Sequence, residues 1–321
     1  LHCGVGFAPL KYGMAYVETR TARIEWPTIG LIALVYGVLA TLVWNHSVLP
    51  WWLLPIGAYF ASLHASLQHE VLHGHPTRKR WLNELLVFVT PTFWLPYGRY
   101  RDTHLQHHHD IDLTDPARDP ESYYLLPDDW ANAGAVKRFF FHINHTLAGR
   151  MIIGPAVSIV RIWVSEIALV LRGDTYRRNE WALFAVSCVI SFVLITVVAG
   201  MPFWKYYLLI AYPGLSLALV RSYCEHQAAA NAQHRTIIVE AHPFWSLLFL
   251  NNNLHVAHHT KPALPWYKIP DYYAAEKDEM ITRNNGYTMQ GYSEIFRRFF
   301  FSAKEPIAYP DLGWLRRPGE N

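Results

Sequence analysis

The chain has 321 residues, of which 52% are hydrophobic and only 17% are charged. Soluble domains carry roughly 25% charged residues, so this composition is typical of a membrane protein rather than a soluble one. The formal net charge of +3 is too small to indicate a nucleic-acid-binding protein. Thirteen tryptophans and nineteen tyrosines agree with many aromatic rings at a membrane–water boundary.

In chain order, the sequence divides into three parts. We expect an N-terminal cytosolic segment over residues 1–26, a membrane domain over residues 27–302 and a C-terminal tail over residues 303–321. Met14 stands shortly before the first apolar run, and residues 1–13 are therefore expected to lie upstream of the native start. The sequence holds no GxGxxG motif, P-loop or haem-binding module, so we expect no reductase within it.

Four stretches approach the length of about 20 mostly apolar residues that a membrane-spanning helix needs. These predicted spans are Ile29–Trp44, Trp51–Gln68, Ala182–Gly200 and Tyr206–Tyr223. Only the short turns of residues 45–50 and 201–205 separate the members of each pair, which predicts two helical hairpins. The segments Leu85–Pro96 and Arg150–Arg172 are also apolar. We expect both to lie on the membrane face, because the first is short and the second carries charges.

The positively charged residues orient these helices. The loop of residues 70–181 holds thirteen Lys or Arg, the part after Cys224 holds ten, and the two hairpin turns hold only Lys205. Because cytoplasmic loops are enriched in Lys and Arg, both termini and the long loop are expected in the cytoplasm. The predicted fold is an all-α integral membrane protein, with four transmembrane helices in two hairpins and a cytosolic helical cap.

Histidine is the unusual residue of this sequence, because eight of its eighteen histidines stand in three short clusters. The clusters are His69/His73, His104/His107/His108 and His255/His258/His259. Side chains three or four residues apart share one helix face, about 5–6 Å apart at Cβ, so each cluster can present its imidazoles to one metal site. All three clusters fall on the predicted cytoplasmic side.

The number of imidazoles points to more than one metal ion. Eight are twice what one tetrahedral zinc ion requires. They suit two metal ions of five or six coordination that keep open positions, held in the cytosolic cap. Imidazole itself serves zinc, copper, iron and nickel and does not choose among them. A nitrogen-rich metal pair beside a membrane favours iron and dioxygen chemistry.

Three such clusters in this order, on two predicted hairpins, resemble the membrane fatty-acid desaturase and hydroxylase superfamily. The resemblance extends over about residues 60–270. It implies a non-haem enzyme with two iron ions, in which the eight clustered histidines are the metal ligands and catalytic residues. The family places a further histidine near the end of the fourth span, which implies His226 as a ninth ligand. An asparagine that acts through water in some members matches Asn252 or Asn253.

The resemblance implies that the enzyme uses O2 to desaturate the acyl chain of a lipid. Hydroxylation of a membrane lipid, an alkane or a carotenoid is the alternative, because both reactions need the same metals and the histidine pattern does not separate them. The implied partners are a lipid or acyl substrate, O2, the membrane and a separate ferredoxin- or cytochrome-like electron donor. The expected location is a bacterial inner membrane, with the active site on the cytoplasmic side.

The alternative from another functional class is a histidine-rich metal transporter or sensor. Such a protein places ionisable ligands inside its spans, along a pathway. The predicted spans of this chain are almost free of them, with His64 the nearest exception. The clustered histidines gather at one membrane face instead, which favours the enzyme.

Several acidic residues adjoin the clusters. Glu70 and Glu225 each stand beside a predicted ligand, and four aspartates follow the second cluster: Asp110, Asp112, Asp115 and Asp119. Metal-bound histidines usually donate their second ring N–H to a carboxylate or carbonyl, so some of these acids are candidates for that role. A solvated acidic loop explains the aspartates equally well. His75 and His109 are expected behind the ligands or at the surface.

Overall fold

The computed structural model describes residues 24–109 and 111–311, and these are mostly helical, as the predicted all-α fold requires. The expected start at Met14, Asp110 and the end of the C-terminal tail lie outside the described residues. The described helices are α1 (Trp26–Trp44), α2 (Ile56–Leu72), α3 (Arg80–Leu86), α4 (Tyr97–His107), α5 (Pro127–Ala131), α6 (Ala135–Asn144), α7 (Leu147–Ile152), α8 (Gly154–Leu171), α9 (Thr175–Phe192), α10 (Phe203–Tyr206), α11 (Tyr212–Ser222), α12 (Pro243–Leu248), α13 (His255–Thr260), α14 (Ile269–Arg283) and α15 (Tyr292–Phe299). Two short strands, β1 (Ile238–Val239) and β2 (Thr288–Met289), pair in parallel.

Four helical segments of the described chain are long and apolar enough to cross a membrane: Trp26–Trp44, Gly154–Leu171, Thr175–Val198 and Phe203–Ser222. Three of them coincide with predicted spans. The fourth is α8, which we expected on the membrane face. The predicted span Trp51–Gln68 is missing from this set, because α2 begins only at Ile56 and has 17 residues. The pairing into hairpins and the cytosolic position of the cap stay predictions.

Two of these segments contain a π-helical turn. The turn Val193–Val198 continues α9, and the turn Tyr207–Ala211 connects α10 to α11. The sequence places Pro213 inside the fourth predicted span, where a proline removes a backbone hydrogen bond and ordinarily breaks a helix. Here Pro213 lies in the first turn of α11, directly after the π-helical turn, so the chain stays helical from Phe203 to Ser222.

Small side chains allow α2 and α11 to approach closely. A Cβ atom at Gly214 would lie 2.8 Å from the Cβ of Ala61 and 3.1 Å from the carbonyl oxygen of Ala58. Close crossings over small residues are typical of helices that pack within a membrane. This contact fixes the two helices side by side, so that the end of α2, with its histidines, lies near the end of α11.

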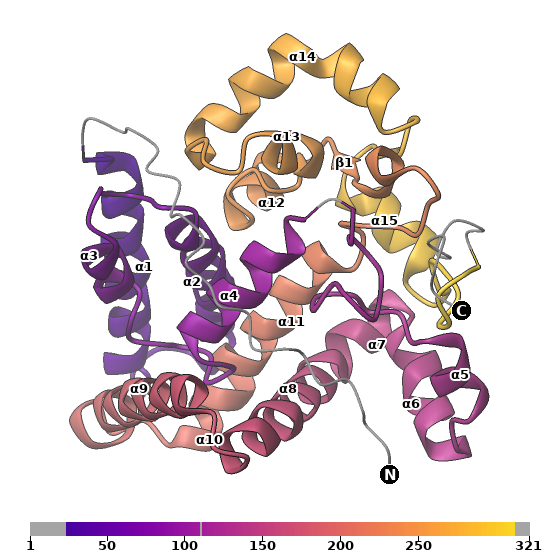
Figure 1. Ribbon diagram of the computed structural model, residues 1–321. Helices are drawn as coiled ribbons and strands as arrows, with labels where there is room; N and C mark the ends of the chain where they lie inside the picture. Colours follow the sequence, from indigo (N-terminus) through magenta and orange to yellow (C-terminus); the bar gives the residue numbers. More distant parts are fainter. Residues whose placement is uncertain (1–23, 110, 312–321) are drawn as a thin grey trace.

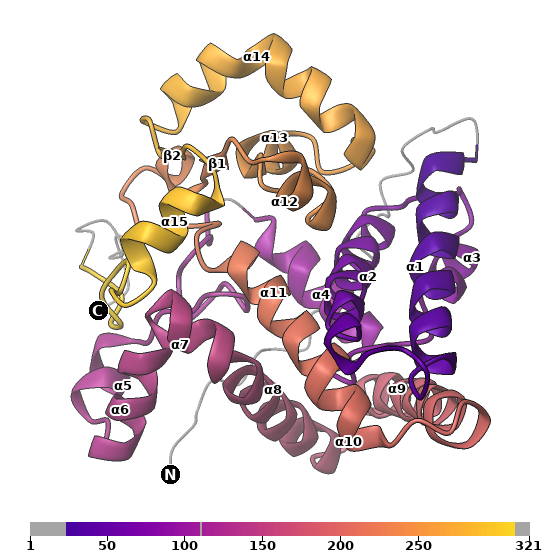
Figure 2. The same ribbon diagram turned by 180° about the vertical axis from the view of Figure 1, so that it is seen from behind.

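Helices α12, α13 and α14 lie together at one end of the molecule, and α8, α9 and α10 lie at the opposite end (Figures 1 and 2). Helices α1, α2 and α3 lie along one side and α4 and α11 in the middle, while α5, α6 and α7 lie on the side away from α1, with α5 and α6 level with α8, α9 and α10. The arrangement brings the ends of α2, α4 and α11 toward α13. These are the four places that carry the clustered histidines.

Candidate metal centre

The nine predicted ligand histidines come together in the structure as two groups. Within each group the nearest ring nitrogens all lie within 4.8 Å of one another. The five-histidine group contains His69, His73, His104, His108 and His258, and the four-histidine group contains His107, His226, His255 and His259. Each group mixes residues from distant parts of the sequence, so tertiary packing and not local spacing alone builds the site.

The position of each histidine on its helix explains how the clusters point toward the two groups. His69 and His73 are one helical turn apart, with His73 as the C-terminal cap of α2. His104 and His107 lie in the last turn of α4, and His108 caps it. The spacing of the second cluster divides its members, because His104 and His108 face the five-histidine group while His107 faces the other. The third cluster is divided too, because His258 faces the five-histidine group while His255 and His259 face the four-histidine group.

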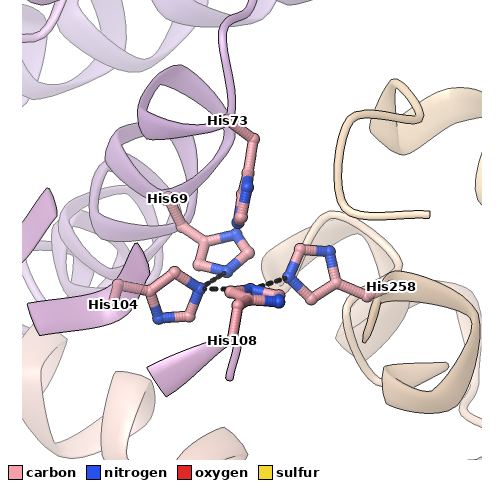
Figure 3. Close-up of side chains that lie close together, drawn as sticks. All are labelled: His69, His73, His104, His108 and His258. Atoms are coloured by element: carbon pink, nitrogen blue, oxygen red, sulfur yellow. Dashed lines mark hydrogen bonds between the residues drawn. The ribbon is translucent and has the colours of Figure 1, made fainter. Parts of the chain in front are cut away.

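In the five-histidine group, the Nε2 atoms converge from three directions (Figure 3). His104 Nε2 lies 2.9 Å from His69 Nε2 and 3.0 Å from His108 Nε2, and His258 Nε2 lies 3.1 Å from His108 Nε2. The buried Nε2 atom of His73 has no hydrogen-bond partner among the described residues. These separations are those of neighbouring ligand atoms on one metal ion, whose bonds to imidazole are about 2.0–2.1 Å long.

The four-histidine group repeats this geometry. His226 Nε2 lies 2.9 Å from His107 Nε2 and 3.0 Å from His255 Nε2. The ring of His259 completes the group, with its centroid 4.6 Å from that of His255 and 5.0 Å from that of His226. His226 follows α11 and is 6% exposed, so the residue predicted from the fourth span lies inside the cluster and not at the surface.

Three of the histidines form hydrogen bonds through Nδ1, the ring nitrogen that points away from the group, to side chains outside it. His107 Nδ1 donates to Asp119 Oδ1 at 2.9 Å, His104 Nδ1 to Glu121 Oε1 at 3.1 Å, and His255 Nδ1 to Asn252 Oδ1 at 2.9 Å. A neutral imidazole has one N–H and one lone pair. With the hydrogen on Nδ1, the lone pair is on Nε2. In their neutral form, His104, His107 and His255 therefore present an Nε2 lone pair to the group, and this lone pair can bind a cation.

Burial and mutual proximity keep most of these rings neutral. Burial first, and then the neighbouring histidines, hold the pKa of His104, His226 and His258 well below the ordinary value of 6.5. Burial also acts to lower the pKa of His107, but the nearby carboxylates of Asp119 and Glu121 outweigh it and raise the pKa to about 9. A metal ion requires the deprotonated ring, and three of these four rings are already in that form near neutral pH.

Asp119 is the member of the predicted aspartate run that lies behind a ligand. It is buried, and it also accepts the backbone N–H groups of Thr114 and Glu121 at 2.8 and 2.9 Å. Glu121, which was not predicted as a site residue, comes two residues later in the Asp-Pro-Glu segment. Burial raises the pKa of Glu121 to about 7. Its position could have been inferred only from the pattern of a carboxylate behind each metal-bound histidine.

The two candidate asparagines have different positions. Asn252 contacts the histidines, because its amide nitrogen also lies 3.5 Å from His69 Nε2. Asn253 instead donates to the carbonyl oxygen of Val239 at 2.7 Å, which fixes the loop before α13. Asn252 is therefore the one placed to act at the site, and its action through water stays a prediction. His109, expected behind the ligands or at the surface, is exposed.

The fold is that of a helical protein with segments able to cross a membrane. Its two histidine groups form a buried, nitrogen-rich site that could hold metal ions. The sequence matches the family model of fatty acid desaturases over residues 46–291, a range that includes all nine histidines. The protein therefore belongs to the fatty acid desaturase family. No curated protein matches the sequence. Membership of this family supports an oxidoreductase of the desaturase or hydroxylase type.

Proposed function

We propose that this protein is a membrane-bound non-haem di-iron oxidoreductase that uses O2 to desaturate the acyl chain of a lipid. One observation carries the proposal: nine buried or partly buried histidines converge in two groups, in which the Nε2 atoms of neighbouring rings lie as close as 2.9 Å. Two groups of five and four imidazoles provide room for two iron ions that keep open positions.

Each group would hold one iron ion. The iron pair supplies the activation of O2 that removal of hydrogen from an unactivated C–H bond requires. The chain's own residues hold the metals and fix the ring orientations. Asp119, Glu121 and Asn252 each accept a Nδ1–H and so point Nε2 of the bound ring inward. Burial of the rings excludes bulk water from the reacting atoms.

The substrate that suits this setting is a lipid-soluble acyl chain. The candidate spans expose many large apolar side chains, among them Leu34 at 52%, Val164 at 67% and Val197 at 71%, and a bilayer would cover such surfaces. A substrate dissolved in the bilayer can reach the helix ends that carry the histidines. We place the active site on the cytoplasmic side of a bacterial inner membrane, with electrons supplied by a separate ferredoxin- or cytochrome-like protein.

Mass spectrometry of total lipids tests the reaction directly. Expression of the gene in a host without this activity should produce acyl chains that have lost two hydrogens. Expression of the His258→Ala variant at the same level is the matched control and should leave the lipids unchanged.

Other results would reassign the chemistry. A gain of one oxygen atom would identify a hydroxylase of a lipid, alkane or carotenoid that uses the same site. Unchanged lipids together with metal uptake into the cells would contradict the enzyme and favour a metal transporter. The positions of the histidines argue against transport, because they gather at helix ends and not along the spans.

A further inference from the structure

A separate group of buried ionisable side chains lies beside the histidine cluster: Glu25, Glu70 and His75. Their side chains are 5%, 8% and 1% exposed. Glu25 is the residue before α1, Glu70 lies in the last turn of α2, and His75 follows that helix by three residues. None of the three belongs to either histidine group.

Hydrogen bonding accounts for one side of the His75 ring but not the other. His75 Nδ1 donates to Glu25 Oε1 at 2.8 Å. His75 Nε2 is buried and makes no hydrogen bond of good geometry among the described residues, although the backbone of Ala263 lies near the ring, and it lies 3.8 Å from Glu70 Oε1. That separation is too long for a hydrogen bond. Two metal–ligand bonds of about 2.0–2.2 Å each can span it.

The charges in this group also call for a cation. Within the described part of the chain, His75 is the only ion-pair partner of Glu25 and of Glu70. Burying an ionised carboxylate is costly unless its charge is compensated. A proton on His75 would compensate one of the two negative charges, and the other would need a proton on Glu70, whose pKa is raised by burial, or a cation. A divalent cation would compensate both and leave His75 a neutral ligand.

We propose that Glu70 and His75 bind a third metal ion, a divalent cation of the zinc class, with Glu25 orienting the imidazole. One imidazole nitrogen and one carboxylate are ligands that zinc accepts, water would complete its coordination, and a carboxylate behind the histidine is the usual second partner. The site does not depend on which metals occupy the two histidine groups.

The proposed ion would connect three distant parts of the chain. Glu25 directly precedes α1, Glu70 lies next to His69 on α2, and the backbone N–H of Trp266 donates to Glu70 Oε1 at 3.0 Å. Trp266 follows the third histidine cluster, and its indole N–H donates to Thr28 of α1 at 3.2 Å. A cation at this junction would hold the end of α2 against the loop after α13.

The number of zinc ions bound by the metal-free full-length protein, compared between the wild type and a variant of this site, tests the proposal. After dialysis against Zn²⁺ alone, mass spectrometry of bound metal should find one equivalent fewer in His75→Phe than in the wild type. His142→Phe, which changes an exposed histidine, is the control and should bind as many equivalents as the wild type. Equal zinc content in the wild type and His75→Phe would overturn the proposal, however many ions the histidine groups bind.

A second variant covers the case in which His75→Phe does not fold. Glu25→Gln keeps the size of the side chain and weakens only the orientation of His75. Loss of such an orienting carboxylate typically lowers metal affinity about 10- to 100-fold. Titration of the metal-free protein with Zn²⁺ should therefore show one site weakened at least about tenfold. Unchanged affinity at every site would contradict the proposed role of Glu25.

Discussion

Replacing one histidine in either group, by His107→Ala or by His258→Ala, should lower turnover by more than about 100-fold while the protein still inserts into the membrane. Loss of a residue behind a ligand already costs about 10- to 100-fold in metal affinity or activity, and loss of a ligand removes a direct bond. His107 belongs to the four-histidine group and His258 to the five-histidine group, so the pair of variants tests both.

The measurement is the yield of oxidised lipid per membrane-inserted protein. His109→Ala is the matched control, because His109 is in the same run as His107 and His108 but is exposed. It should retain near-normal turnover. Near-normal turnover in His107→Ala or His258→Ala would mean that the ligand assignment is wrong for that group.

The largest loss of stability is expected from breaking the buried ion pair between α4 and α8. Arg99 Nε donates to Glu166 Oε2 at 2.8 Å, and Arg99 Nη2 donates to Glu166 Oε1 at 3.1 Å. Both residues are 9% exposed. Removing one partner of a buried pair typically costs about 3–5 kcal/mol when the other is left unpaired, but Glu166 also pairs with Arg177 Nε at 3.3 Å and keeps that partner. Arg99→Met should therefore lower the free energy of unfolding by about 3 kcal/mol, the lower end of that range.

Denaturant unfolding in detergent gives this quantity. The double variant Arg99→Met with Glu166→Leu should recover most of the loss, since apolar pairs of similar volume often replace buried ion pairs without cost. Arg298→Met is the control, because its ion pair with Glu294 is on the surface and is worth at most about 1 kcal/mol. If Arg99→Met were as mild as Arg298→Met, the Arg99–Glu166 pair would not be a significant link between α4 and α8.

The Arg99–Glu166 pair also explains why the sequence did not predict α8 as a membrane-spanning helix. The charges at Arg161 and Glu166 argued that α8 lies on the membrane face, yet the structure makes it one of the membrane-capable helices. In the structure, Glu166 is buried against Arg99, which is 67 residues away, while Arg161 is exposed. A partner that distant is invisible to a window of local hydropathy.

Local spacing and the family resemblance together selected the histidines that lie close to one another in the structure. The separations within each cluster predict shared helix faces, and the family resemblance adds His226; the structure brings all of these residues together. Spacing did not predict the division of the second and third clusters between two groups. It also missed Glu121, because the loop that brings Glu121 back to His104 shows no periodic pattern. Residues behind the ligands follow from tertiary contacts and not from the motif.

Anomalous diffraction at the iron edge, from crystals of the iron-loaded protein, tests the central claim most directly. We predict two iron peaks, one among the Nε2 atoms of the five-histidine group and one among those of the four-histidine group. A single peak, or no peak within bonding distance of either group, would contradict a di-iron site formed by these nine histidines.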